Sequence, residues 1–175
     1  MVYRELEGHE LKPSLFEDFQ RRQQVTQCWR KIDGQWQIRD IAFVDDWNQA
    51  DYQELLEELR KTLTAGGVIF SAWAGDKMKG FASMEGRPLG SRANYMDLSN
   101  LYVSREMRGQ GVGRALFRLA EEWARSHGAE KLYISAHSAV ESQAFYRAVG
   151  CVEAVEYNPA HVAKEPCDCQ MERVL

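Results

Sequence analysis

The sequence predicts a mixed α/β fold, in which helices flank a twisted and mostly antiparallel β-sheet. Short apolar runs of β type alternate along the chain with segments whose apolar residues recur at helical spacing. Several β-type runs are joined by short turn signals such as Asp33-Gly34 and Gly75-Asp76-Lys77-Met78, which favour antiparallel hairpins. The length of 175 residues and the hydrophobic content of 45% fit one domain, residues 1–175, with a substantial core.

Each strand is predicted from a β-type run that is bounded by turn residues. In chain order, the predicted strands are residues 2–6, 25–36, 37–44, 68–74, 79–85, 95–103, 131–136, 152–157 and 169–175. The last two are separated by Asn158-Pro159 and by a predicted irregular loop that runs through Pro166.

Helices are predicted where a capping signal precedes apolar residues at helical spacing. Ser14-Leu15-Phe16-Glu17 and Ser138-Ala139-Val140-Glu141 have the S-x-x-E form of a capping box, and Asp46-Trp47-Asn48-Gln49 offers an N-cap with Gln at position N3. A further helix begins near residue 112 and runs to about residue 127. Glycines end three of these helices, at Gly66-Gly67, Gly128 and Gly150.

Residues 101–116 organise the chain, because a strand there passes into a helix through Arg108-Gly109-Gln110-Gly111-Val112-Gly113. The first N–H groups of a helix lack partners, the helix dipole adds positive charge, and glycines let a phosphate approach closely. Arg105, Arg108, Arg114 and Arg118 against Glu106 give a local charge of four minus one, or +3, in a protein whose formal charge is -4. The segment is therefore predicted to bind a small polyanion.

Spacing excludes two common phosphate loops. A GxGxxG fingerprint would need glycine in place of Arg114 or a small residue in place of Leu116, and no GxxxxGK[ST] string exists. The segment instead contains R-x-x-G-x-G, formed by Arg108, Gly111 and Gly113, directly after a strand that ends in Leu-Tyr-Val. It resembles the pyrophosphate loop of the GCN5-related N-acetyltransferase (GNAT) superfamily.

The resemblance implies the acyl-CoA N-acyltransferase fold and an enzyme that transfers acetyl from its co-substrate, acetyl-CoA, directly to a primary amine. It implies a backbone contact between pantetheine and the strand residues Leu101, Tyr102 and Val103. The pyrophosphate would be held by Arg108, Gly109, Gln110, Gly111, Val112, Gly113 and Arg114. Residues 68–175 would form the acetyl-CoA-binding core, and residues 1–67 a more variable acceptor-side portion.

The same resemblance implies that Tyr146 is the catalytic acid. The segment from Phe145 to Cys151 is similar to the family's FYxxxGF pattern, in which the tyrosine hydroxyl protonates the departing thiolate. A phenol with an ordinary pKa of about 10 stays protonated at neutral pH. An interfacial tyrosine with its ring in the core is the alternative interpretation. Two positions differ from the family: Cys151 replaces an aromatic residue, and Ala139 stands where an asparagine often contacts pantetheine, so Ser138 or Ser142 would have to substitute.

Asp97 is the expected catalytic base, because many family members carry an acidic residue six positions before the valine that ends this strand. It would draw a proton from the acceptor's ammonium, through water, although an exposed strand residue or a ligand for a substrate cation is an alternative. His137 is a further candidate base and acceptor contact, with helix capping as its commoner role. Trp47 is assigned to acceptor binding because aromatic faces beside carboxylates hold cationic amines, although core packing explains such residues as well.

Composition narrows the expected partners and location. The net negative charge argues against nucleic acid, and no basic segment with an apolar stretch or membrane-length apolar run is present. We therefore expect a cytoplasmic protein with reduced cysteines and no membrane partner. The Cys167-x-Cys169 spacing is not that of a zinc-binding CxxC pair, so no metal is predicted.

The acceptor is expected to be a small-molecule amine or a peptide, and dimerisation is common in the resembled family. Two alternatives to the acetyltransferase remain at this point. One is a non-catalytic module that senses acyl-CoA, and the other is a transferase for a longer acyl chain.

Overall fold

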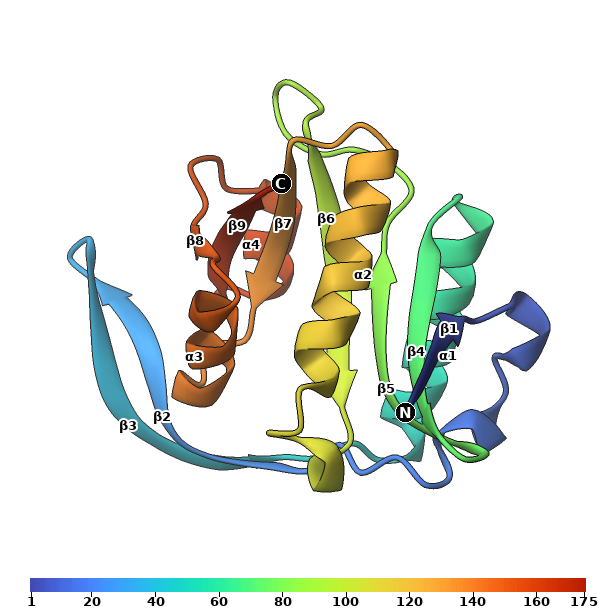
Figure 1. Cartoon of the computed structure of the whole chain (residues 1–175). Coiled ribbons are helices and arrows are strands. Elements are labelled where there is room, and N and C mark those ends of the chain that lie inside the picture. Colours follow the sequence, from blue (N-terminus) through green and yellow to red (C-terminus); the bar gives the residue numbers. More distant parts are fainter.

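The computed structural model describes residues 1–175 and is built around a seven-stranded sheet with the strand order β1-β4-β5-β6-β7-β9-β8 (Figure 1). These strands are β1 (Val2–Glu5), β4 (Val68–Ala74), β5 (Lys77–Met84), β6 (Tyr95–Val103), β7 (Lys131–Ala136), β8 (Val152–Glu153) and β9 (Cys169–Val174). All neighbouring pairs are antiparallel except β6 and β7, which are parallel. The predicted mixed fold with a mostly antiparallel sheet is confirmed.

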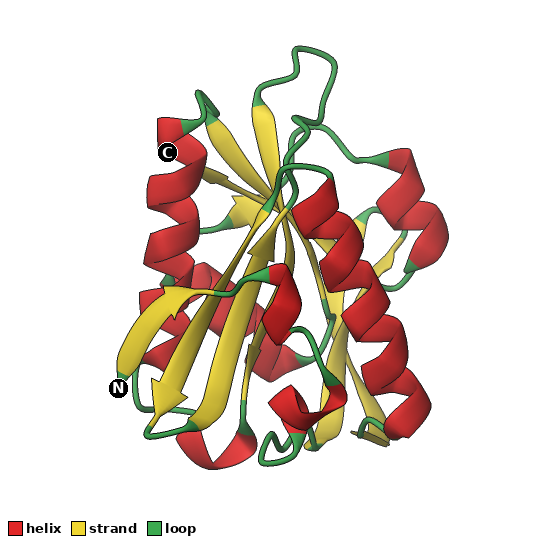
Figure 2. Cartoon of the chain, turned by 90° about the vertical axis from the view of Figure 1, so that its right-hand side faces the viewer, coloured by secondary structure: helices red, strands yellow, loops and turns green.

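Helices cover both faces of this sheet (Figure 2). The α-helices are α1 (Gln49–Thr64), α2 (Val112–Ser126), α3 (Val140–Ala148) and α4 (Pro159–Lys164), and the 3-10 turns are η1 (Gly8–Glu10), η2 (Pro13–Phe16) and η3 (Arg105–Met107). None of the α-helices combines the length and the apolar composition that crossing a membrane requires.

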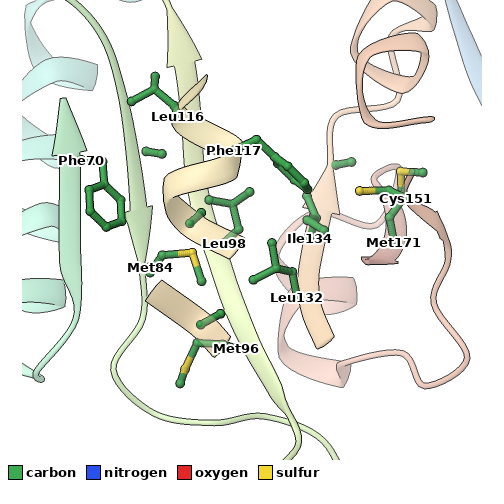
Figure 3. Close-up of a cluster of buried hydrophobic side chains, with 14 of the residues drawn as sticks. Phe70, Met84, Met96, Leu98, Leu116, Phe117, Leu132, Ile134, Cys151 and Met171 are labelled. Carbon is green, nitrogen blue, oxygen red and sulfur yellow. The ribbon is translucent and has the colours of Figure 1, made fainter. Parts of the chain in front are cut away.

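The main hydrophobic core lies between α2 and the sheet (Figure 3). Leu116 and Phe117 of α2 pack there with Leu98 of β6 and Ile134 of β7, and all four side chains are almost fully buried. A second core on the other face joins α1 and η2 to β4 and β5, with Leu59 and Phe81 completely buried. β6 contributes Met96 and Leu98 to the first core, and its partly buried Tyr102 packs against the second.

A long hairpin of β2 (Gln23–Ile32) and β3 (Gln35–Asp45) stands apart from the main sheet (Figure 1). It turns at Asp33 and Gly34, whose positive φ values of 50° and 78° are typical of the tight hairpin turn that the sequence predicts. The hairpin reaches α3, where the Trp29 amide donates a 2.8 Å hydrogen bond to the carbonyl of Ser138. Residues 23–45 therefore reach the C-terminal half of the molecule.

Several local predictions are wrong. The segment at Ser14 is the short 3-10 turn η2, and no side chain caps it. Phe16 is its one buried residue. The helix predicted from Asp46 begins later, with Asn48 as its N-cap and Asp51 at N3. Ser138 does not cap α3, whose N-cap is Ala139.

The C-terminal segment also differs from its prediction. The strand expected over residues 152–157 is only β8, because the pairing with β9 covers just Val152 and Glu153, and Val155 is 84% exposed. The predicted irregular loop contains α4, which is capped by Asn158. Cys167 is exposed before β9, whereas Cys169 is buried, so the two thiols do not share a strand face.

Candidate active site

The two central strands diverge inside the sheet. β6 and β7 pair only over residues 95–97 and 131–133, while β5 pairs with β6 as far as Val103. Alternate N–H and C=O groups of β6 beyond Asp97 therefore face a side on which no strand pairs with them. An extended ligand can bind there as an added strand, and this stretch includes the predicted pantetheine contacts Leu101, Tyr102 and Val103.

A β-bulge re-aims the side chains of β6 where the strands separate. Ser83 pairs with Asn100 but Met84 pairs with Leu98, so Ser99 is an extra residue. Ser99 is fixed by a 2.6 Å hydrogen bond from its hydroxyl to the Glu85 carboxylate. Such bulges are frequent beside active sites, where they interrupt pairing and redirect side chains.

The glycine loop brings an uncapped helix end next to this free strand edge. Gly111, the N-cap of α2, has a φ of 83° and no side chain, and the first turn of α2 contains no acidic residue. By contrast, the Asn48 side chain accepts hydrogen bonds from two backbone amides of α1. The first amides of α2 are therefore available to an anion such as a pyrophosphate.

The side chain of Arg108 donates its hydrogen bonds to backbone carbonyls of the protein. Its Nε donates a 3.1 Å hydrogen bond to the carbonyl of Val103, and its Nη2 donates one of 2.9 Å to the carbonyl of Arg21. The side-chain amide of Gln110 likewise donates a 2.9 Å hydrogen bond to the carbonyl of Glu106. Arg108 and Gln110 thus shape the loop, whereas Arg114 is an exposed cation on the first turn of α2.

Gly113 is the point at which three predicted site segments converge. A Cβ added there would lie 3.2 Å from the Phe145 ring of α3 and 3.5 Å from the Val103 side chain of β6. The absence of a side chain lets α2 approach both elements. The glycine loop, the end of β6 and the Phe145-Tyr146 segment therefore form one locality, as the resemblance predicts.

Tyr146 lies half-buried in α3, with its ring 6.4 Å from that of Phe117. Burial is the main cause that raises its pKa, with smaller contributions from Tyr102, Cys151 and Asp168, and no hydrogen bond acts on its hydroxyl. The phenol therefore stays protonated throughout the physiological pH range, which suits a proton donor. Cys151 is buried in the main core and its pKa is raised to about 12 by burial, so its replacement of an aromatic residue is a packing change.

Asp97 lies where β6 and β7 begin to diverge, opposite Tyr133 in the register. Its side chain is 7% exposed, and its Oδ2 lies 2.7 Å from Nε2 of His161 on α4. Its Oδ1 is buried without a hydrogen-bond partner. The structure thus rejects the alternative of an exposed strand residue and shows a partner, His161, that the sequence analysis missed.

The two other candidates for acceptor binding have structural contacts. The Trp47 ring packs 4.7 Å from that of Tyr102 and 5.0 Å from the guanidinium of Arg21, which forms an ion pair with Asp45. His137 accepts a 3.1 Å hydrogen bond at Nδ1 from the amide of Ala139, the N-cap of α3. Trp47 is thus part of the packing around the strand edge, and His137 acts at a helix start.

The position expected to hold an asparagine is sterically closed. Ala139 is completely buried against Val25 and Cys28 of the hairpin. The neighbouring Ser138 hydroxyl accepts a 2.7 Å hydrogen bond from Arg30 of β2, so it is already occupied. The hairpin therefore fills the space where the resemblance expects an asparagine side chain to contact pantetheine.

Comparison with known proteins identifies the family. The model of the acetyltransferase (GNAT) family matches residues 32–151. The chain belongs to this family. The aminoglycoside N(6')-acetyltransferase type 1 of Stenotrophomonas maltophilia is 33% identical to this GNAT protein, over 61% of this chain and 73% of that protein. The uncharacterized N-acetyltransferase YobR of Bacillus subtilis (strain 168) is 42% identical over 40 residues, which are 23% of this chain and only 16% of YobR.

Solved GNAT structures share the whole architecture. Nourseothricin acetyltransferase superposes with a TM-score of 0.68 at 18% identity, over 99% of this chain and 97% of that chain. A protein assigned as a streptothricin acetyltransferase of Bacillus anthracis str. Ames, solved with acetyl coenzyme A, gives 0.68 at 16% identity, over 98% and 95%. The predicted acyl-CoA N-acyltransferase fold is therefore confirmed. The family also confirms an N-acetyltransferase with acetyl-CoA as co-substrate.

Proposed function

We propose that this GNAT protein acetylates a primary amine on a small, multiply charged cationic molecule, by direct transfer within a ternary complex. The observation that carries this proposal is the meeting of the uncapped α2 N-terminus, the free edge of β6 and the Phe145-Tyr146 segment of α3 around Gly113. These groups supply an anion site, a groove edge for an extended arm and a proton donor.

The chain's own groups divide the binding of acetyl-CoA between them. The first amides of α2 and the cation of Arg114 hold the pyrophosphate. Pantetheine hydrogen-bonds to the backbone of Leu101–Val103 in place of the missing strand partner. With about 3.3 Å per residue, β6 runs roughly 20 Å from Val103 back to Asp97. The arm is thereby directed along β6 toward the buried carboxylate.

Tyr146 and Asp97 carry out the two proton transfers. Asp97 removes a proton from the acceptor's ammonium, through water, so that the nitrogen lone pair can attack the thioester carbonyl carbon. As the N–C bond forms and the C–S bond breaks, the Tyr146 hydroxyl donates its proton to the departing thiolate. The acceptor nitrogen then loses a second proton, which passes through solvent and reprotonates the Tyr146 phenolate.

The acceptor class is proposed from charge and from the named relative. Tyr102 lies on the free edge of β6. Burial is the main cause that raises its pKa; Arg21 opposes the rise, and Asp45, Asp168 and Glu58 add to it. Asp45 is paired with Arg21 and Glu58 with Lys164, so Asp168 is the carboxylate of the three without an ion pair, and it favours a cationic acceptor. The relative with 33% identity is named for the 6'-amine of aminoglycosides. An aminoglycoside-like amine is therefore the first acceptor to test.

The test measures thiol release from acetyl-CoA with the purified protein. An aminoglycoside with a 6'-amino group is compared with an analogue that has a 6'-hydroxyl, with a linear polyamine, and with peptides bearing a lysine or a free N-terminus. Fast release with the 6'-amine and none with the 6'-hydroxyl supports the proposal. Release with peptides alone would contradict the small-molecule acceptor.

The same assay separates the rival functions. An acyl-CoA sensor would bind coenzyme A in calorimetry but release no thiol with any amine. A transferase for longer chains would prefer butyryl-CoA or octanoyl-CoA over acetyl-CoA. The Asp97→Asn variant should retain affinity for acetyl-CoA and lose turnover, since the amide cannot accept the ammonium proton.

The remaining proposals concern organisation and location. We assign acceptor recognition mainly to residues 1–67 and cofactor binding to residues 68–175. The protein is proposed to act in the cytoplasm, where its four cysteines stay as free thiols, and without nucleic-acid or membrane partners. Light scattering on the assayed preparation will show whether it forms the homodimer that is common in the resembled family.

A further inference from the structure

We propose that His161 is the positioning residue for Asp97: it occupies one carboxylate oxygen, so that the other faces the proton path from the acceptor amine. This inference rests on the proposed function. It assigns a role to α4, an element outside the predicted site.

The carboxylate of Asp97 is held on one side only. His161 Nε2 lies 2.7 Å from Oδ2, whereas Oδ1 is buried with no partner in the chain. An ionised carboxylate can only accept hydrogen bonds, so Nε2 must be the donating nitrogen. A buried carboxylate oxygen without a partner is costly, and native proteins keep one where a water or a substrate group completes it. Oδ1 is therefore the atom left for the acceptor's proton.

The imidazole of His161 is held in this orientation by other elements. Its ring stacks on that of Tyr133 of β7, with 5.5 Å between centroids and 22° between planes. Tyr133 is fixed in turn, since its hydroxyl accepts a 2.8 Å hydrogen bond from the amide of Asn158. The Asn158 side chain caps α4 through the amides of Ala160 and His161. His161 is thus a rigid support for Asp97.

The hydrogen bond from His161 to Asp97 forms with the imidazole in either protonation state. The hydrogen bond with Asp97 is the main cause that raises the pKa of His161; burial and Lys164 oppose the rise, and Asp168 adds to it. Both the protonated ring and the neutral ring with a proton on Nε2 can donate to Oδ2. The orientation of Asp97 therefore does not depend on whether His161 is charged.

A second contact, an exposed ion pair, joins α4 to α1. The Lys164 ammonium lies 2.9 Å from the Glu58 carboxylate of α1. This ion pair joins α4 to a helix that is more than a hundred residues earlier in the chain, on the same side of the sheet. A displaced α4 would withdraw His161 from Asp97, so the position of the base depends on this helix.

Two variants of similar size test the proposal. His161→Gln keeps an N–H donor that can reach Oδ2, whereas His161→Leu keeps apolar bulk against Tyr133 without a donor. We expect His161→Leu to lower kcat/KM for the acceptor on the order of tenfold or more, as loss of a charge-assisted hydrogen bond does, and His161→Gln to restore most of it. The KM for acetyl-CoA and the Tm should stay close to wild type in His161→Gln.

A double-mutant cycle removes the ambiguity of a folding defect. In the Asp97→Asn background, His161→Leu should cause little further loss, because the group that it positions has already been removed. Equal activity of the His161→Leu variant and the wild type would overturn the inference, as would equal losses in His161→Leu and His161→Gln. If the wild type itself releases no thiol with any amine, the proposed function fails instead, so the two failures are distinguishable.

Discussion

The guanidinium of Arg108 donates a 3.1 Å hydrogen bond to the carbonyl of Val103, which ties the first residue of the R-x-x-G-x-G motif to the last residue of β6. A second bond, 2.9 Å long, reaches the carbonyl of Arg21 just before β2. The Arg108 side chain therefore joins three segments of the chain. The proposed binding of the pyrophosphate is thus left to the backbone amides of α2 and to other cations.

We expect Arg108→Ala to weaken coenzyme A binding by changing the loop's shape. Loss of the two charge-assisted hydrogen bonds costs roughly 1–3 kcal/mol, which should also lower the Tm by several degrees. Calorimetric titration and a thermal melt measure the two effects. Arg92→Ala removes an exposed charge from the loop before β6, outside the glycine segment, and serves as the control. A fall in affinity without any change in Tm would instead indicate direct pyrophosphate contact by Arg108.

Gly113→Ala should push α3 away from α2. The added methyl group would lie 3.2 Å from the Phe145 ring, which must shift by a few tenths of an ångström; overpacking costs about 1–3 kcal/mol, and the better helix propensity of Ala offsets up to about 1 kcal/mol of it. Because Tyr146 follows Phe145, turnover should fall together with Tm. Gly8→Ala is the matched control, since nothing lies within 4 Å of a Cβ at that position.

A second substitution, at Phe145, should partly restore the activity and Tm of the Gly113→Ala variant. Combining Gly113→Ala with Phe145→Leu removes the ring that the methyl group would press on, so activity and Tm should recover in part. If the double variant is as impaired as the sum of the single variants, the contact with Phe145 is not the reason for glycine at this position.

Tyr146→Phe should lower kcat by about 100-fold or more, because general acid catalysis contributes at least that much. The affinity for coenzyme A should stay unchanged, since the ring still packs on Phe117. Tyr3→Phe, at the far edge of the sheet on β1, is the control. Full turnover in the Tyr146→Phe variant would exclude this hydroxyl as the proton donor.

The attachment of the hairpin should weaken in acid. Glu153 of β8 accepts hydrogen bonds from Lys31 at 2.5 Å and from the indole of Trp36 at 3.0 Å. Lys31 is the main cause that lowers the pKa of Glu153, to about 2 from an ordinary 4.5, with Tyr157 next. A lowered folded-state pKa stabilises the protein fully above pH 4.5, and this stabilisation is lost as pH falls toward 2.

Glu153→Gln measures this contribution. The pair is exposed, so the variant should lower the Tm at pH 7 by only about 1–4 °C. The difference from wild type should shrink as the pH falls from 4.5 toward 3, because the Glu153 carboxyl of the unfolded chain takes up a proton there while the folded one, with a pKa of about 2, stays ionised. A difference in Tm that stays constant over this range would contradict the assignment.

The central part of the fold was predictable from sequence because its signals are local. The bounds of β4, β6 and β7 agree with the predicted residues, and α2 ends before Gly128 as expected. The glycine motif and the Phe145-Tyr146 segment also indicated a common site, and Gly113 joins them. Strong β-type runs and glycine stops depend little on tertiary contacts.

The elements that were missed depend on distant contacts. Asn158-Pro159 is a usable signal for a helix start, with an N-cap followed by proline, but the helix is only six residues long. Nothing near His161 in the sequence indicates that its ring meets Asp97, which is 64 residues earlier. Ser138 has the form of a cap, yet Arg30 of the hairpin takes its hydroxyl. Pairings of this kind follow from the assembled fold.

The ion pair between Lys164 and Glu58 bears on how substrate preference can evolve or be engineered in this enzyme. The proposed acceptor-side segment contacts the helix that carries His161, so exchanging the first 67 residues with those of a relative would replace the Glu58 partner of Lys164. A chimera that carries residues 158–168 along with its new N-terminal third would keep both partners of this ion pair from one parent.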